Sequence, residues 1–503
     1  MTTLNCWATV LIAVLSLPNV AASADPVAEA YQKGVSSLDK LDYDAAITAF
    51  TEAIGLNPKF GDAYCNRGAA YNKKGEYGKA IADFNEAIRL NPKRADAHID
   101  RGTAFWHKGK LDNSITDFTE AIRLDPKDAR AYYNRGGAYE KKGDHDKAIV
   151  DFTEAIRQKP DFADTYYARG VAYRHKGEYD KSIADYSEAI RISPQYAIAY
   201  RSRGVAYGAK REYDKEIADC TKALRLDSKD AETYYTRGLA YRHKGEYDKE
   251  IADYSEAIRI SPKFAHAYCN RGVAYEEKGE YSKSIVDCTE ALRLNPNDAV
   301  AYNGRGLAYG EKGELDKAIA DYSEAIRLDP KYAIAYNNRG KAYDGKHEYD
   351  KSIADCTEAL RLDPKHTAAY NNRGIAYERK GEYDKAIADY SEAIRLDAKY
   401  ARAYNNRGLA YAHKGEYDKA ITDCTEAIRL DAKYARAYNN RGLAYAHKGE
   451  YDKAITDCTE AIRLNPKYGG AYQMRGQAYA KKGDKVKAEE DFVQAKKLGY
   501  TEK

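Results

Sequence analysis

Paired asparagines recur at a fixed spacing in the second half of the chain. The pairs are Asn337-Asn338, Asn371-Asn372, Asn405-Asn406 and Asn439-Asn440, one every 34 residues. A side-chain amide both donates and accepts hydrogen bonds, so a row of amides can match the alternating groups of an extended polypeptide backbone. The plainer interpretation is that water solvates these amides and no partner binds them.

Arginine and aspartate follow the same spacing along most of the chain. An arginine occurs thirteen times from Arg67 to Arg475, and an aspartate follows each of them in a second register from Asp83 to Asp491. Where Lys33 replaces the arginine, Ala49 replaces the aspartate. Because the two residues are present or absent together, we predict a ladder of structural ion pairs. The alternative is that the arginines bind carboxylates of a partner. The pairs include Arg67–Asp83, Arg135–Asp151, Arg373–Asp389 and Arg407–Asp423.

Histidines in a further register raise the question of a metal site. They are His107, His175, His243, His413 and His447. A zinc ion needs its nitrogen ligands at about 2 Å, whereas packed helices lie about 8–10 Å apart. Only His413 and His447 stand one spacing apart, and no carboxylate–histidine cluster with local ligand spacing surrounds them. We therefore expect surface histidines, no metal and no cofactor.

The motifs of common catalytic sites are missing from the sequence. It has no phosphate-binding loop, no nucleophile elbow and no His-Glu-x-x-His pair. Lys plus Arg (82) nearly balances Asp plus Glu (78), and the two signs are interspersed. Binding to nucleic acid needs a one-sided basic surface. We therefore expect neither an enzyme nor a nucleic-acid-binding protein.

A glycine repeats every 34 residues from Gly34 to Gly476, which means fourteen copies of one unit. Within a unit, apolar and small residues recur at helical spacing on both sides of a turn glycine such as Gly143, and a proline such as Pro160 ends many units. Each unit is therefore predicted to be a helix, a tight turn and a second helix. Arg211 and His347 replace the turn glycine, so we expect irregular turns there.

The units resemble tetratricopeptide repeats. One unit places Tyr132, Gly136, Tyr139, Ala148, Phe152 and Pro160 at the positions that define that family. The resemblance implies an all-α, right-handed superhelical solenoid of stacked antiparallel helix pairs. The fourteen repeats fill residues 27–502, with the ranges 27–60, 61–94, 95–128, 129–162, 163–196, 197–230, 231–264, 265–298, 299–332, 333–366, 367–400, 401–434, 435–468 and 469–502.

The same resemblance implies a concave groove lined by the first helices. At the fifth position of the repeat, Tyr133, Tyr167 and Tyr235 would face the groove in the first half, and the paired asparagines would do so in the second. We predict a non-catalytic scaffold that binds a protein or an extended peptide there. The alternative is a cell-envelope component that binds or guides a polysaccharide or peptidoglycan strand, because tyrosine stacks on sugars and asparagine bonds hydroxyl groups.

The first 24 residues carry no charged side chain and end in Ala22-Ser23-Ala24. This pattern is typical of a signal peptide, so we expect export to the periplasm or outside the cell and no membrane span after cleavage. The alternative is an uncleaved membrane anchor. The seven cysteines after residue 24 are predicted to be buried thiols, with a Cys269–Cys288 link left open. The charged last repeat lacks a capping helix, which leaves end-to-end association of copies open.

Overall fold

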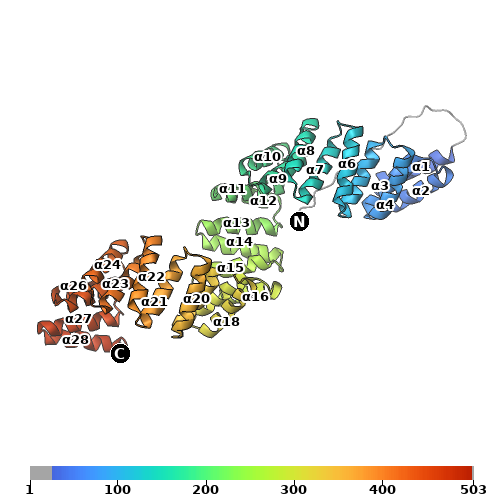
Figure 1. Cartoon of the computed structure of the whole chain (residues 1–503). Helices are drawn as coiled ribbons and strands as arrows, with labels where there is room; N and C mark the ends of the chain where they lie inside the picture. The colour runs from blue at the N-terminus through green and yellow to red at the C-terminus, as the bar shows by residue number, and fades with distance from the viewer. Residues whose placement is uncertain (1–24, 501–503) are drawn as a thin grey trace. The chain divides into compact units, whose positions relative to one another are not determined.

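The structure is a computed structural model that describes residues 25–500. These residues form 28 α-helices and no strand, so the predicted all-α class is confirmed. The chain divides into two compact units between Ile260 and Ser261, and each unit is described by itself. In each unit the helices follow one another as antiparallel pairs in chain order (Figure 1).

The first unit holds seven helix pairs. Its helices are α1 (Pro26–Asp39), α2 (Tyr43–Leu56), α3 (Gly61–Lys74), α4 (Tyr77–Leu90), α5 (Ala95–His107), α6 (Leu111–Leu124), α7 (Ala129–Lys142), α8 (His145–Gln158), α9 (Ala163–His175), α10 (Tyr179–Ile192), α11 (Ala197–Ala209), α12 (Tyr213–Leu226), α13 (Ala231–His243) and α14 (Tyr247–Ile260).

The second unit also holds seven pairs. Its helices are α15 (Ala265–Glu277), α16 (Tyr281–Leu294), α17 (Ala299–Glu311), α18 (Leu315–Leu328), α19 (Ala333–Gly345), α20 (Tyr349–Leu362), α21 (Thr367–Arg379), α22 (Tyr383–Leu396), α23 (Ala401–His413), α24 (Tyr417–Leu430), α25 (Ala435–His447), α26 (Tyr451–Leu464), α27 (Gly469–Lys482) and α28 (Lys485–Lys497).

Within each unit, odd-numbered helices are the first helices of the repeats and even-numbered helices the second. A first helix packs against the second helix of its own repeat and against the second helix of the preceding repeat. First helices of adjacent repeats also contact each other, whereas the second helices of adjacent repeats make no comparable contact among residues 25–500. Each unit is therefore a solenoid in which the first helices form the more crowded side.

The repeating glycine sits where two helices of one repeat approach most closely. A Cβ atom on Gly374 would lie 2.6 Å from the ring of Tyr390, and one on Gly408 would lie 2.8 Å from the sulfur of Cys424. Tyr390 and Cys424 are both fully buried. The glycine is thus required because an aromatic ring or a thiol from the second helix fills the space of its missing side chain.

All seven cysteines between residues 25 and 500 are buried free thiols, as predicted, and Cys269 and Cys288 form no disulfide. Burial raises the pKa of Cys356 and Cys424 to about 12. A thiol that stays protonated and buried is chemically inert.

The expectation of irregular turns at Arg211 and His347 is wrong. Both residues adopt the left-handed backbone conformation of the glycines they replace, with φ of 62° and 61° against 79° for Gly75. Such a conformation costs a non-glycine residue on the order of 1 kcal/mol. The packing of the flanking helices therefore fixes the turn, whichever residue occupies it.

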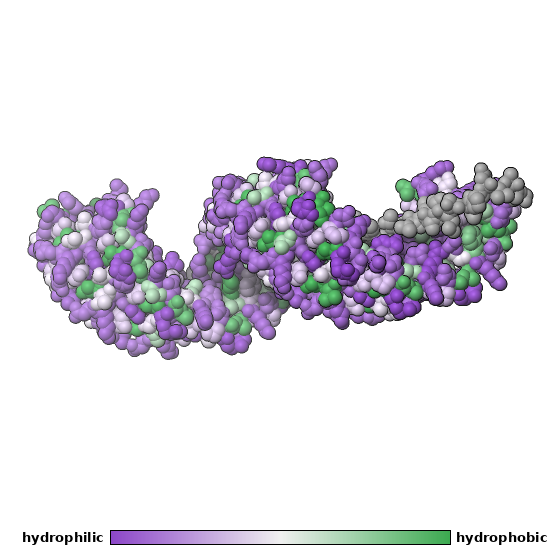
Figure 2. All heavy atoms as spheres, turned by 90° about the horizontal axis from the view of Figure 1, so that it is seen from above, coloured by the Kyte–Doolittle hydropathy of each residue, from purple (hydrophilic) through white to green (hydrophobic). Residues whose placement is uncertain are grey.

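The predicted signal peptide, residues 1–24, lies outside the described residues. Among the helices of residues 25–500, none has the combined length and apolar character that spanning a bilayer requires. On the face shown in Figure 2, hydrophilic residues predominate and apolar residues form scattered patches.

Candidate functional site

The arginine at the seventh position of the repeat forms a two-pronged ion pair in every repeat that has it. In all thirteen, Nε and Nη2 donate to the two carboxylate oxygens of the aspartate sixteen residues later, at 2.6–2.9 Å. The set includes Arg67–Asp83, Arg135–Asp151, Arg373–Asp389 and Arg407–Asp423. These guanidinium groups are bound inside the array and do not point at a partner.

The same arginines also connect adjacent repeats. Nη1 of Arg373 donates to the hydroxyl oxygen of Thr357 in the preceding repeat at 3.1 Å, and Nη1 of Arg407 donates to Ser391 at 3.0 Å. The hydroxyl of Thr357 in turn donates to the carbonyl oxygen of Ile353. One guanidinium therefore holds three helices: its own, the second helix of its repeat and the second helix of the preceding repeat.

The asparagines of the second unit form a continuous chain of hydrogen bonds. The Nδ2 of the second asparagine in a pair donates to the Oδ1 of the first asparagine in the preceding pair, at 3.0 Å between Asn372 and Asn337 and again between Asn406 and Asn371. Within a pair, the first amide donates to the second, as Asn405 does to Asn406 at 3.1 Å. The chain extends from Asn303, which accepts from Asn338, to Asn439, which donates to Asn440.

The structure corrects the expected exposure of several predicted partner-binding residues. The exposed fractions are 4% for Tyr133, 6% for Asn337, 0% for Asn371, 3% for Asn405 and 8% for Asn440. The fifth position lies between adjacent first helices rather than on the open surface. Asn338, Asn372, Asn406 and Asn439 are half-buried.

The predicted groove tyrosines of the first unit pack against the core ring of their own repeat. The ring centroids are 5.9 Å apart for Tyr133 and Phe152, and 5.6 Å apart for Tyr167 and Tyr186 and for Tyr235 and Tyr254. The hydroxyl of Tyr167 also lies 3.4 Å from Oγ of Ser202 in the next repeat. Tyr167 and Tyr235 remain half-buried at the edge of the first-helix side.

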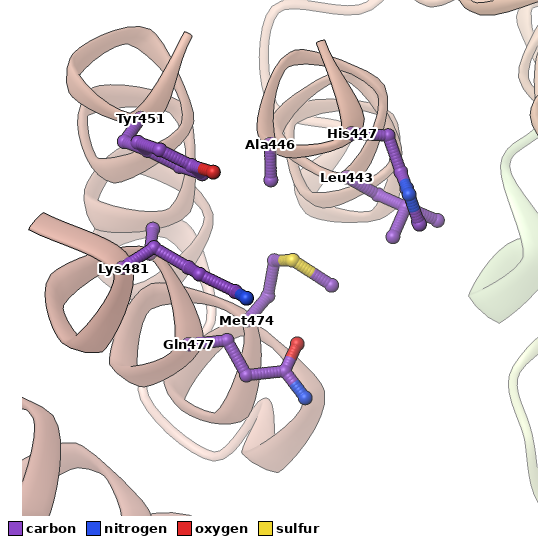
Figure 3. A pocket seen from close by; sticks show the side chains of 8 residues that line it. Leu443, Ala446, His447, Tyr451, Met474, Gln477 and Lys481 are labelled. Carbon is purple, nitrogen blue, oxygen red and sulfur yellow. The ribbon is translucent and has the colours of Figure 1, made fainter. Parts of the chain in front are cut away.

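An open cavity lies on the first-helix side of the last two repeats. Its volume is about 310 Å³, and it is lined by Leu443, Ala446, His447, Tyr451, Met474, Gln477, Ala478 and Lys481. In the close view, Met474 lies between Leu443 and Lys481, and the Lys481 ammonium group points toward the cavity (Figure 3). The walls therefore combine apolar carbon and sulfur atoms with a cation at the rim.

Four of the five histidines in the common register are stacked on a tyrosine of the preceding repeat. The partners are His107 on Tyr77, His243 on Tyr213, His413 on Tyr383 and His447 on Tyr417, with centroids 4.7–5.1 Å apart and rings within 14° of parallel. Burial lowers the pKa of His107 and His413. The fifth, His175, lies instead beside His145 and Glu140.

Sequence reasoning missed this group of Glu140, His145 and His175. The three come from three helices and are not adjacent in the sequence. A signal was nevertheless present: His145 replaces, in one repeat, the tyrosine on which the next repeat's histidine otherwise stacks.

Stacked helix hairpins without a conspicuous catalytic cluster define a repeat solenoid of the kind that presents an extended surface. The chain belongs to the tetratricopeptide repeat family. A family model described as tetratricopeptide repeat matches residues 61–94, 129–162, 265–298, 333–366, 401–434 and 435–468. Others of the family match residues 39–75, 102–143, 172–210, 238–279, 309–345 and 379–415, residues 152–184, 288–320 and 356–388, and residues 469–498.

Solved structures with similar folds include larger tetratricopeptide assemblies. The APC/C hetero-tetramer Cut9–Hcn1 is 17% identical, with a TM-score of 0.49 over 90% of this chain and 96% of that one. Yeast Tom70 is 19% identical, with a TM-score of 0.40 over 88% and 100%. A tetratricopeptide repeat protein from Parabacteroides merdae is 20% identical, with a TM-score of 0.42 over 49% and 98%. A comparison with curated protein sequences found no matching relative.

Proposed function

We propose that this protein is a non-catalytic scaffold that binds an extended peptide, or an extended segment of a protein, on the first-helix side of its second unit. Proteins of this family are in general scaffolds for protein–protein interaction. The observation that carries the proposal is the cavity of about 310 Å³ between α25 and α27, which joins an apolar floor to a cationic rim.

The floor suits one apolar side chain of a partner. Leu443 and Met474 supply it, and a thioether adapts its shape to different side chains. The ammonium group of Lys481 is at the rim, where it would attract a carboxylate. The preferred ligand is therefore a peptide in which an apolar residue is next to an acidic one.

The half-buried asparagines offer a second set of contacts. The amide of Asn372 donates one hydrogen bond, to Asn337, and accepts one, from Asn371. An amide has two N–H groups and two acceptor sites, so one of each is left for a partner. Asn406 repeats the arrangement one repeat later. A peptide backbone along these repeats would meet donors and acceptors at a regular interval.

Binding should be tested with a peptide array and a glycan array probed with the same preparation of full-length chain. The Leu443→Lys variant, which charges the cavity floor, should lose its peptide signals. The Thr456→Lys variant is the matched control, because it adds the same charge to an exposed face of the same repeat. Signals on the glycan array alone, or peptide signals that survive Leu443→Lys, would refute the proposal.

A further inference from the structure

Glu140 in α7, His145 in α8 and His175 in α9 bring one carboxylate and two imidazoles together. The Nδ1 of His145 lies 2.8 Å from Oε2 of Glu140, and the Nδ1 of His175 lies 2.5 Å from Oε1. One ligand atom from each residue falls within 4.8 Å of the other two. Within residues 25–500, this is the one group of three histidine, cysteine or acidic side chains with such spacing.

The cluster departs from the pattern of the other repeats. Where a tyrosine precedes the histidine, the two rings stack nearly parallel, as in the 1° angle between Tyr417 and His447. The rings of His145 and His175 are also close, with centroids 5.1 Å apart, but they are tilted by 46°. The tilt turns both Nδ1 atoms toward the carboxylate of Glu140, whose side chain is only 9% exposed.

We propose that Glu140, His145 and His175 bind one divalent transition-metal ion, with Zn²⁺ as the reference ion. Two imidazole nitrogens and a carboxylate oxygen are a common zinc ligand set, and imidazole disfavours Ca²⁺ and Mg²⁺. Zinc bonds of about 2.0–2.2 Å in a tetrahedron put the ligand atoms about 3.3 Å apart. The Nδ1–carboxylate distances of 2.8 and 2.5 Å must therefore widen by less than 1 Å. The fourth ligand is water, admitted beside His175, whose side chain is 41% exposed.

Arg174 opposes the metal and so gives the site a distinctive signature. Its Nη2 lies 3.0 Å from Nε2 of His175. A guanidinium only donates, so Nε2 accepts and the proton of this imidazole is on Nδ1, facing Glu140. A metal on Nδ1 requires the proton on Nε2 instead, and Arg174 must then turn away. Removing this side chain should strengthen metal binding, because it also removes a nearby positive charge.

The bound ion would connect two adjacent repeats. Glu140 and His145 belong to the repeat of α7 and α8, whereas His175 belongs to the next. Metal binding to the folded arrangement alone stabilises that arrangement. We therefore expect the ion to slow amide hydrogen exchange in α7, α8 and α9 more than in the matching helices α23, α24 and α25.

The test uses full-length chain without a histidine tag, titrated with Zn²⁺ in a calorimeter and with Co²⁺ in an absorption spectrometer. We expect one ion per chain and no thiolate-to-cobalt charge-transfer band. Glu140→Gln and His145→Tyr should each weaken binding at least about tenfold, and Arg174→Ala should strengthen it. His145→Tyr restores the residue found in the other stacks, so it should fold normally, as circular dichroism would check.

His243→Asn is the matched control, since it removes a stacked histidine from another repeat. Unchanged affinity in this variant, with loss in His145→Tyr, supports the site. No binding by the wild-type chain would overturn the proposal. Equal affinity in the wild-type, Glu140→Gln and His145→Tyr proteins would also overturn it, as would a thiolate band, which would assign the metal to cysteines.

Discussion

The Nδ2 of Asn406 donates a 3.0 Å hydrogen bond to the Oδ1 of Asn371, which precedes it by 35 residues in the sequence. Asn371 has no exposed surface, and its own amide faces Asn372. The same step recurs between Asn337 and Asn372 and between Asn405 and Asn440. A polar chain therefore runs between the first helices, where an apolar seam would otherwise be expected.

Removing one link should destabilise the second unit. Asn371→Ala leaves the donor of Asn406 without its buried acceptor, which costs about 1–3 kcal/mol of unfolding free energy. Urea denaturation of the variants Asn371→Ala, Asn406→Ala and their combination would measure the coupling. We expect the double variant to lose clearly less than the sum of the single losses. Strictly additive losses would mean that the two amides do not interact.

The arginine–aspartate pair should matter more than its charges alone suggest. The side chain of Asp389 is 8% exposed and that of Arg373 is 19% exposed. Arg373→Ala leaves a buried carboxylate unpaired, so we expect a loss of about 3 kcal/mol in unfolding free energy. Arg373→Lys keeps the charge but cannot form the fork and also bond Thr357, so it should be intermediate.

The same repeat supplies a control for this prediction. Arg395 pairs with Glu392 on the outer surface, where their side chains are 66% and 33% exposed. Arg395→Ala should cost less than about 1 kcal/mol. Equal losses for Arg373→Ala and Arg395→Ala in urea denaturation would show that burial and the third contact contribute nothing.

The sequence was sufficient for the fold because its defining residues act within one repeat. Gly374 and Tyr390 pack against each other inside a hairpin, so their 34-residue recurrence reports the hairpin directly. The orientation of Asn371 depends instead on how one first helix rotates against the next, which a pattern within one repeat does not specify. Glu140, His145 and His175 come together through the same stacking of neighbours, and for that reason the spacing of histidines alone did not reveal them.

Adding a methyl group at the close approach of the two helices should be costly. The Cβ of Gly374→Ala would lie 2.6 Å from Cε1 of Tyr390, whose hydroxyl donates to Oε2 of Glu378 at 2.9 Å. The ring cannot move away without weakening this bond, so we expect a loss of about 1–3 kcal/mol. Gly55→Ala is the control, because nothing lies within 4 Å of the new atom and the residue is in helix α2.

Gly55→Ala should stabilise the chain by about 0.5–1 kcal/mol, since alanine favours a helix. Thermal unfolding followed by circular dichroism compares the two variants. A neutral or stabilising Gly374→Ala would show that the hairpin can open at this point without loss.

Glu216 should make the first unit less stable as the pH rises. Its side chain is buried on α12, where other repeats carry alanine or serine, and Gly208 leaves room for the carboxyl group. Burial raises the pKa of Glu216 from 4.5 to about 7. Between these values the folded chain holds a proton that the unfolded chain releases, so folding stability falls as the pH rises from about 4.5 to 7.

The shift of about 2.5 pKa units corresponds to about 3 kcal/mol, with the full penalty present above pH 7. Glu216→Gln keeps the shape and removes the charge. It should therefore be more stable than the wild type at pH 8 and nearly equal to it at pH 4.5. Urea denaturation of both proteins across this range gives the difference at each pH, and other titrating groups cancel in the comparison. A difference that does not grow with pH would mean that the carboxylate is solvated in the folded chain.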